Sequence, residues 1–172
     1  MARNSIISAL KHPWSPTAAR VAVLLALFSG MAMAAQDDAQ TGVKMKKSFV
    51  RGTWQKSRAF SPAVITEGGK IVWIAGHGGQ KDSAGNSLAG NFDAQTRQAF
   101  KNIDATLKEA GASLKDMVTM TVFLADARYT TRMTEIRAEI FGDDFPASAA
   151  ITVTGFADPS MLIEIQGIAV VR

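Results

Sequence analysis

The sequence predicts a single α+β domain, in which one mostly antiparallel sheet carries two helices on one face. Short segments with continuous or alternating apolar residues predict strands, and two longer segments with apolar residues every three or four positions predict helices. These segments follow one another in the order β-β-α-β-α-β-β, which favours a layer of helices packed on one sheet. The chain has 172 residues, enough for one domain with a sizeable core.

The first 34 residues have the pattern of a bacterial secretory signal. Residues 1–20 contain three basic residues and no acidic one, an apolar run covers 21–28, and residues 32–34 are the small-x-small triplet Ala-Met-Ala. The apolar run is shorter than the about 20 residues that span a bilayer. We therefore expect Sec-type export, cleavage after Ala34, a periplasmic or secreted mature protein, and no stable membrane anchor. The alternative is an uncleaved amphipathic anchor.

The mature chain is predicted to begin with a flexible lead-in, because residues 35–47 are polar and basic. The domain itself is expected to cover residues 48–172. Phe49–Gln55 is a candidate edge strand, and Pro62 interrupts the chain after it, because proline fixes φ. Ile71–Ala75 is a continuous apolar run of the kind that forms a buried strand.

The first helix is predicted between a glycine-rich loop and Gly111. Gly76, Gly78 and Gly79 follow the buried strand and predict a loop whose backbone can approach a ligand closely. Asp93 is the expected N-cap, and Gly111 suits the position after the last turn. The apolar face of this helix consists of residues three and four positions apart: Ala99, Phe100, Ile103, Leu107 and Ala110.

The remaining elements complete the predicted sheet. Residues 117–124 alternate and predict a strand, and a second helix is expected over Thr130–Phe141, ending at Gly142. Strands are then predicted over Ala149–Thr154 and Leu162–Val171. The sheet face without helices carries Ile and Val side chains, and an uncovered apolar face of this kind predicts association between subunits.

Composition excludes several classes of site. The net charge is +4, but without the three basic residues of the predicted signal it falls to +1, which does not suit a nucleic-acid-binding protein. The chain contains no cysteine, so disulfides, thiolate nucleophiles and zinc–thiolate sites are excluded. His77 is the only histidine outside the predicted signal, so no metal site is expected.

Three segments in the second half of the chain occur in an order and spacing that chance does not explain. They are the run NIDATLKEAGASLKDMVTMTVFLAD over 102–126, Phe145-Pro146-Ala147, and MLIEIQGIAV over 161–170. Together they resemble the RidA/YjgF family, formerly described as L-PSP endoribonucleases, over roughly Phe60 to Arg172. The resemblance implies a chorismate-mutase-like fold and a homotrimer that binds a small molecule in clefts between subunits. It also implies hydrolysis of enamines and imines to ketoacids and ammonia without a metal or organic cofactor.

The resemblance assigns two catalytic candidates and a backbone contact. Glu164 corresponds to a glutamate on the last strand that positions or activates water, and the glycine-containing loop corresponds to Gly76 and its neighbour His77. A carboxylate among Leu and Ile is costly to bury, and burial can raise its pKa into the range used for proton transfer. The alternative for Glu164 is a solvent-facing carboxylate or one paired with a lysine across the trimer. His77 is either a proton donor or ligand contact, or a loop side chain without a role.

Three substrate-binding positions depart from the family pattern. The carboxylate-binding arginine is Ser148, a tyrosine after a proline is Ala63, and an asparagine of the second helix is Thr134. A guanidinium binds a carboxylate with two hydrogen bonds of about 1.5–3 kcal/mol each, which a hydroxyl cannot reproduce. The departures predict a roomier and more neutral cleft for a larger or less anionic ligand. Arg128 or Arg132 can replace the missing arginine, or both are exposed charges at the helix end.

Two functional hypotheses remain open from the sequence. The first is an exported deaminase of imines or enamines, with Glu164 and His77 near the reacting water and Gly76 and Ser148 shaping the pocket. The second is a non-catalytic trimer that binds a small metabolite or protects other proteins through its apolar surface. Ser148 favours the second hypothesis, and the family resemblance favours the first.

Overall fold

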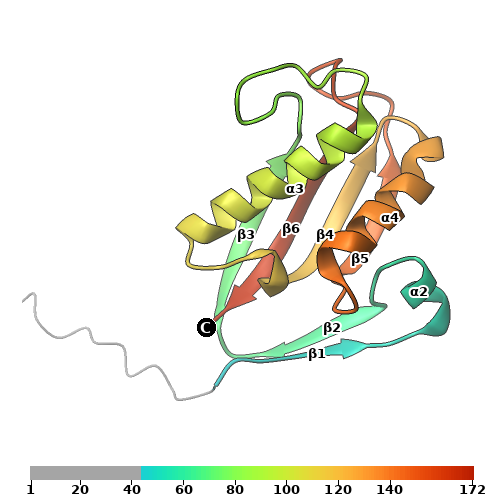
Figure 1. Cartoon of the computed structure of the whole chain (residues 1–172). Coiled ribbons are helices and arrows are strands. Elements are labelled where there is room, and N and C mark those ends of the chain that lie inside the picture. Colours follow the sequence, from blue (N-terminus) through green and yellow to red (C-terminus); the bar gives the residue numbers. More distant parts are fainter. Residues whose placement is uncertain (1–43) are drawn as a thin grey trace, which may run out of the picture. The chain divides into compact units, whose positions relative to one another are not determined.

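The computed structural model describes residues 44–172. The predicted signal over 1–34 and most of the predicted lead-in over 35–47 lie outside this part of the chain. The described residues form a four-stranded sheet, a second sheet of two strands and three α-helices, which agrees with the predicted α+β class (Figure 1). No helix within the described residues is long and apolar enough to cross a membrane.

The central sheet has the strand order β3-β6-β4-β5, formed by Lys70–His77, Ile163–Val171, Met117–Leu124 and Ala147–Thr152. Strand β6 pairs antiparallel with both β3 and β4, whereas β4 and β5 run parallel. The parallel pair is possible because helix α4, Thr130–Phe141, crosses over between these two strands. The prediction of a mostly antiparallel sheet is therefore confirmed.

The N-terminal part differs from the prediction. Strand β1 covers Lys46–Val50 and pairs antiparallel with β2, Ala63–Glu67, in a second sheet of two strands. The strand expected over Phe49–Gln55 is wrong in its second half, where the short helix α2 forms over Thr53–Ser57. Here the carbonyl of Gly52 accepts a hydrogen bond from Lys56 N–H at 2.9 Å, so the backbone closes a helical turn. Strand β1 also includes the last two residues of the predicted lead-in.

Both long helices lie across the same face of the central sheet, as the sequence predicts (Figure 1). Helix α3 covers Phe92–Glu109, and its apolar stripe packs with α4 and the inward side chains of the sheet. The most deeply buried core residues include Phe100, Ile103, Met133 and Ile165. The two helices therefore bury one face of the sheet, and α4 lies next to the edge strand β5.

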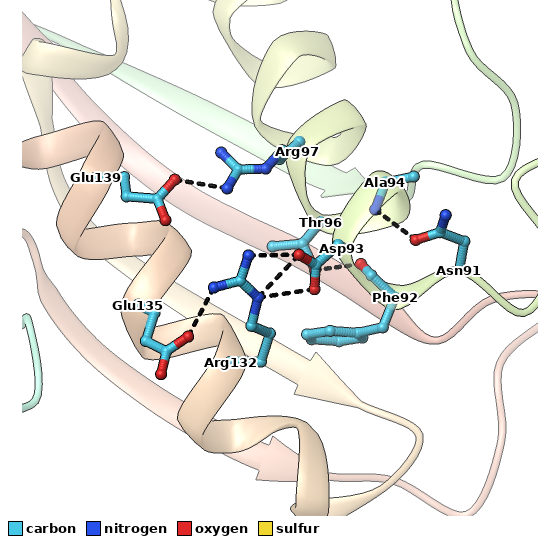
Figure 2. Close-up of polar contacts among 9 residues, drawn as sticks. All are labelled: Asn91, Phe92, Asp93, Ala94, Thr96, Arg97, Arg132, Glu135 and Glu139. Carbon is cyan, nitrogen blue, oxygen red and sulfur yellow. Dashed lines mark hydrogen bonds and ion pairs between the residues drawn. The ribbon is translucent and has the colours of Figure 1, made fainter.

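The predicted cap of the first long helix is corrected by the structure. The N-cap is Asn91, whose side chain accepts a hydrogen bond from Ala94 N–H at 3.0 Å, and Asp93 belongs to the first turn. Figure 2 shows that the Asp93 carboxylate instead accepts hydrogen bonds from Arg132 of α4, whose Nε lies 2.8 and 2.9 Å from its two oxygens. Arg132 also donates to Glu135 at 2.7 Å. The acid thus links two helices instead of capping one.

The opposite face of the sheet exposes large apolar side chains within the described residues. Trp73 is 75% exposed, Ile71 is 58% exposed and Ile151 is 46% exposed. Residues on this face alternate with residues buried under the helices, because successive side chains of a strand point to opposite sides. We refer to this surface below as the open face.

Candidate functional site

Glu164 lies on the open face, over the backbone of Gly76. Its neighbours Ile163 and Ile165 are fully buried in the helical core, so the alternation of the strand turns Glu164 to the other side. A Cβ atom on Gly76 would lie 2.1 Å from Oε1 of Glu164, far inside van der Waals contact. Glycine at this position therefore leaves the space that the carboxylate occupies. Within residues 44–172, no basic side chain forms an ion pair with Glu164.

His77 ends strand β3 next to this pair. Desolvation by burial lowers the pKa of His77, and the nearby charge of Glu164 partly opposes this effect. The imidazole is therefore mainly neutral at pH 7, and a neutral imidazole has one nitrogen that donates a hydrogen bond and one that accepts. The structure thus brings together the two predicted catalytic residues and the predicted glycine contact.

A pocket of about 330 Å³ opens on the helix-covered side of the sheet, between α4, the edge strand β5 and the segment that follows α2. Ser148 and Thr134, both predicted as substrate contacts, line this pocket. Its apolar wall includes Trp54, Phe60 and Met133. The described lining residues include no acidic side chain, so the charged side chains of the pocket are all positive.

Ser61 holds the aromatic wall of this pocket in place. Its N–H donates to the carbonyl of Pro146 at 3.1 Å, and its hydroxyl donates to the carbonyl of Phe145 at 2.6 Å. These bonds tie the segment after α2 to the start of β5. The ring of Phe60 in this segment packs edge to face with the ring of Trp54 in α2, with centroids 5.7 Å apart.

Ala63, the third predicted substrate contact, does not join this pocket. It is the first residue of β2, is exposed, and pairs with Val50 in the hairpin. It is not among the residues that line the pocket in the described chain. The structure therefore separates Ala63 from Ser148 and Thr134.

Arg137 is a site residue that the sequence prediction missed. It lies on α4, is 3% exposed, and lines the pocket beside Ser148. Its Nη1 donates to Oγ of Ser148 at 2.7 Å, and its Nη2 donates to the carbonyl of Arg58 at 2.7 Å. The signal was present in the sequence, because Arg137 follows Met133 by four residues and therefore falls on the inner face of the helix.

The two arginines proposed from the sequence as replacements are bound elsewhere. Arg128 makes an ion pair with Asp126 at 2.6 Å and its side chain is 89% exposed. Arg132 is held between two acids on the outer surface of α3 and α4 (Figure 2). Both arginines are therefore exposed charges near the end of the helix, which is the second of the two possibilities that the sequence left open. The cation beside Ser148 comes instead from a third arginine.

The described residues form no group of three or more His, Asp or Glu side chains that could hold a metal ion. The polar groups of the two regions have the chemistry for proton transfer and for hydrogen bonding. Glu164 and His77 can exchange protons with water or with a ligand. Arg137 and Ser148 can bind an anionic or polar group.

Comparison with known proteins now identifies the family. A family model described as Endoribonuclease L-PSP matches residues 53–171, most of the described domain. The chain belongs to the RidA/YjgF family. This family assignment confirms the resemblance that the sequence segments indicated.

Several RidA/YjgF relatives are similar in sequence and in structure. A RutC family protein of Pyrococcus abyssi is 37% identical over 101 residues, which cover 59% of this chain and 79% of that protein. The human 2-iminobutanoate/2-iminopropanoate deaminase is 33% identical over 111 residues, covering 64% of this chain and 79% of that enzyme. A Rid-family protein of unknown function from Yersinia pestis matches the fold with a TM-score of 0.64 and 26% identity, over 73% of this chain and 98% of its own.

An arginine from α4 lies beside Ser148, the position at which the RidA/YjgF pattern has an arginine. The resemblance places an arginine at position 148 of β5, and here the guanidinium of Arg137 lies at hydrogen-bonding distance from the serine that occupies it. A positive charge from α4 therefore lies beside Ser148 in the described chain. The roomier and more neutral cleft between subunits stays a prediction.

Proposed function

We propose that this protein is an imine or enamine deaminase, which hydrolyses a reactive C=N compound to a carbonyl compound and ammonia. The observation that carries the proposal is the Glu164 carboxylate, held over Gly76 without a cationic partner in the described chain. The family supports it, because a human relative is named for deamination of 2-iminobutanoate and 2-iminopropanoate. No cofactor is required for this chemistry.

The reaction needs only water and proton transfers. Starting from the protonated imine, Glu164 accepts a proton from a water molecule while the water oxygen bonds to the imine carbon, and the C=N electron pair returns to nitrogen to give a neutral amino group. The same carboxyl then donates its proton to that amino group. The C–N bond breaks as ammonia leaves, and the C=O bond forms while the Glu164 carboxylate accepts the hydroxyl proton and later releases it to solvent. An enamine enters this sequence after protonation at carbon gives the imine. We assign His77, which is mainly neutral at pH 7, the role of a hydrogen-bond donor to the reacting groups.

The proposal requires a second copy of the chain at the site. Glu164 lies on the open face and the Ser148 pocket lies on the helix-covered side, so the two cannot face one ligand within one chain. We propose that the open face, with Trp73 and Ile71 exposed, is covered by neighbouring subunits in a homotrimer. In such a ring the contact is heterologous, so the Glu164 region of one subunit can meet the pocket of the next.

We also propose that the mature protein works after export. The supporting observation is the signal-like pattern of residues 1–34, with its basic start, apolar run and small-x-small triplet. Cell fractionation with N-terminal sequencing tests this directly. A periplasmic or secreted protein that begins at Ala35 is the expected result, and an intact N-terminus in the cytoplasm would contradict it.

The catalytic proposal is tested by ammonia release and imine decay with a panel of freshly generated imines. The mature protein is compared with Glu164→Ala and Glu164→Gln, and with Glu139→Gln as a control on the exposed side of α4. We expect acceleration over buffer by the mature protein and the control, and a loss of about 100-fold or more in both Glu164 variants. No acceleration for any imine would overturn the deaminase and leave the ligand-binding trimer.

A further inference from the structure

Arg137 is a buried cation without an acidic partner in the described chain. Two of its N–H groups donate to neutral oxygens, those of Ser148 and the Arg58 carbonyl, each at 2.7 Å. Its Nε–H is fully buried and has no acceptor within residues 44–172. A guanidinium offers five N–H donors, so three of them have no protein acceptor in the described chain.

Burial makes this arrangement costly for the ligand-free protein. Desolvation lowers the pKa of Arg137 to about 10, so the side chain is still charged at pH 7. Charged groups in protein interiors are normally paired, because the loss of hydration is not otherwise compensated. By contrast, Arg132, one and a half turns earlier on the same helix, binds two carboxylates.

The surroundings of Arg137 combine this charge with an apolar wall. The rings of Trp54 and Phe60 and the side chain of Met133 line the same pocket. Its volume of about 330 Å³ is within the range of small-ligand sites. Arg58, the only other charged residue of the described lining, lies at the rim with its guanidinium 6.0 Å from the Trp54 ring centroid. A ligand that suits this pocket has one anionic end and an apolar body.

We infer that Arg137 binds the carboxylate of the ligand, and that the aromatic wall binds an apolar or aromatic side chain. This inference rests on the proposed deaminase and names its substrate class as 2-imino acids with large apolar side chains. Ser148 accepts from Arg137, so its own hydroxyl hydrogen is free to donate to the second carboxylate oxygen. Thr134 adds another hydroxyl to the lining. A planar carboxylate matches the fork of N–H donors that a guanidinium presents.

Binding of stable 2-oxo acids tests the inference separately from catalysis. Phenylpyruvate is the carbonyl product expected from an aromatic imino acid, phenylacetone has the same ring without the carboxylate, and pyruvate has the carboxylate without the ring. Calorimetry compares the mature protein with Arg137→Gln, and with Arg132→Gln as the matched control from the same helix. We expect Arg137→Gln to weaken phenylpyruvate binding by about 10- to 100-fold and to leave phenylacetone binding unchanged.

A second variant keeps the test decisive if Arg137→Gln folds poorly. Ser148→Asp places a carboxylate beside the guanidinium and pairs it internally. This variant is expected to raise the unfolding temperature and to abolish phenylpyruvate binding. Equal phenylpyruvate affinity in the mature protein, Arg137→Gln and Ser148→Asp would overturn the inference, as would the absence of binding to the mature protein.

The same variants test the proposed deaminase activity separately from carboxylate binding. Glu164→Gln is expected to lose ammonia release while it keeps phenylpyruvate binding, because glutamine keeps the size of the side chain but cannot accept a proton from water. If the mature protein binds phenylpyruvate through Arg137 but hydrolyses no imine, the carboxylate site stands and the deaminase fails. If imines are hydrolysed equally by the mature protein and Arg137→Gln, the deaminase stands and the carboxylate site fails.

Discussion

Each side of the central sheet holds a charged side chain that makes no ion pair in the described chain, and the two charges have opposite sign. On the helix-covered side, Arg137 is buried in a pocket whose described lining has no acid. On the open face, Glu164 lies over Gly76 with no ion-pair partner in the described chain. Elsewhere on the described surface, arginines such as Arg132 are paired with neighbouring acids. Arg132 has a structural role because it joins α3 and α4 through Asp93, and we propose that Arg137 and Glu164 instead act on a ligand and on water.

The largest effect is expected from closing the space under Glu164. Gly76→Ala puts a methyl group where Oε1 of Glu164 now lies, so the carboxylate must move. We expect imine hydrolysis to fall by about 100-fold, because a displacement of about 1 Å is enough for such a loss. Gly155→Ala is the matched control, since no heavy atom lies within 4 Å of its added carbon. Unchanged turnover in Gly76→Ala would show that Glu164 does not act from this position.

A smaller effect is expected from narrowing the pocket on the other side. Ala150 lines it from the edge strand and is exposed, so Ala150→Leu reduces its volume without disturbing the core. We expect kcat/KM to fall about tenfold for imines with an aromatic side chain and to change little for 2-iminopropanoate. Equal losses for both substrates would argue that the pocket does not hold the side chain. The measurement is a comparison of kcat/KM across imines of increasing size.

The paired arginine should affect stability only. Arg132→Gln removes hydrogen bonds to Asp93 and Glu135 between half-exposed groups, and we expect only a small loss in the free energy of unfolding, because solvent screens exposed ion pairs. Urea unfolding of Arg132→Gln, Asp93→Asn and the double variant measures the coupling between the two side chains. Turnover is expected to stay the same. A loss of turnover in Arg132→Gln would contradict the assignment of a structural role to Arg132 and a ligand-binding role to Arg137.

The smallest effect concerns the pH dependence of stability. Burial lowers the pKa of His77 below its ordinary value of 6.5, so between the folded pKa and 6.5 the unfolded chain binds more protons than the folded one. Stability therefore rises with pH through this window and is lost as the pH falls toward the folded pKa. Urea midpoints at pH 5.5 and 7.5 should differ less in His77→Asn than in the mature protein. If the two urea midpoints differed by the same amount in His77→Asn and in the mature protein, the pH dependence of stability would come from groups other than His77.

The parts of the fold that follow a regular pattern were predictable. The two long helices and strand β4 repeat apolar residues with a fixed period, and the structure reproduces their bounds within a few residues. The segment from Val50 to Pro62 has no such period. There a backbone hydrogen bond from Lys56 N–H to the Gly52 carbonyl closes a helical turn. The cap at Asn91 was missed because Asp93 has the same preference and lies only two residues away.

The site was predictable only in part, because its two halves depend on different information. The position of Glu164 beside Gly76 follows from strand pairing, and the family pattern pointed to both residues. The spacing of Arg137 from Met133 puts it on the inner face of α4, but that spacing does not identify it as a ligand contact, and the family pattern places the cation at 148. Only the packing of α4 on β5 shows that its side chain reaches Ser148. The homotrimer and the inter-subunit cleft stay predictions.

The central claim is that the two half-sites are joined across a subunit boundary, and complementation tests it most directly. Arg137→Gln and Glu164→Gln are each expected to be inactive toward an aromatic 2-imino acid. After the two variants are unfolded together and refolded as mixed trimers, about a quarter of the sites should combine an intact Arg137 with an intact Glu164. Recovery of about a quarter of the normal turnover is the predicted result. Mixed trimers, verified by mass spectrometry, that remain inactive would contradict the account.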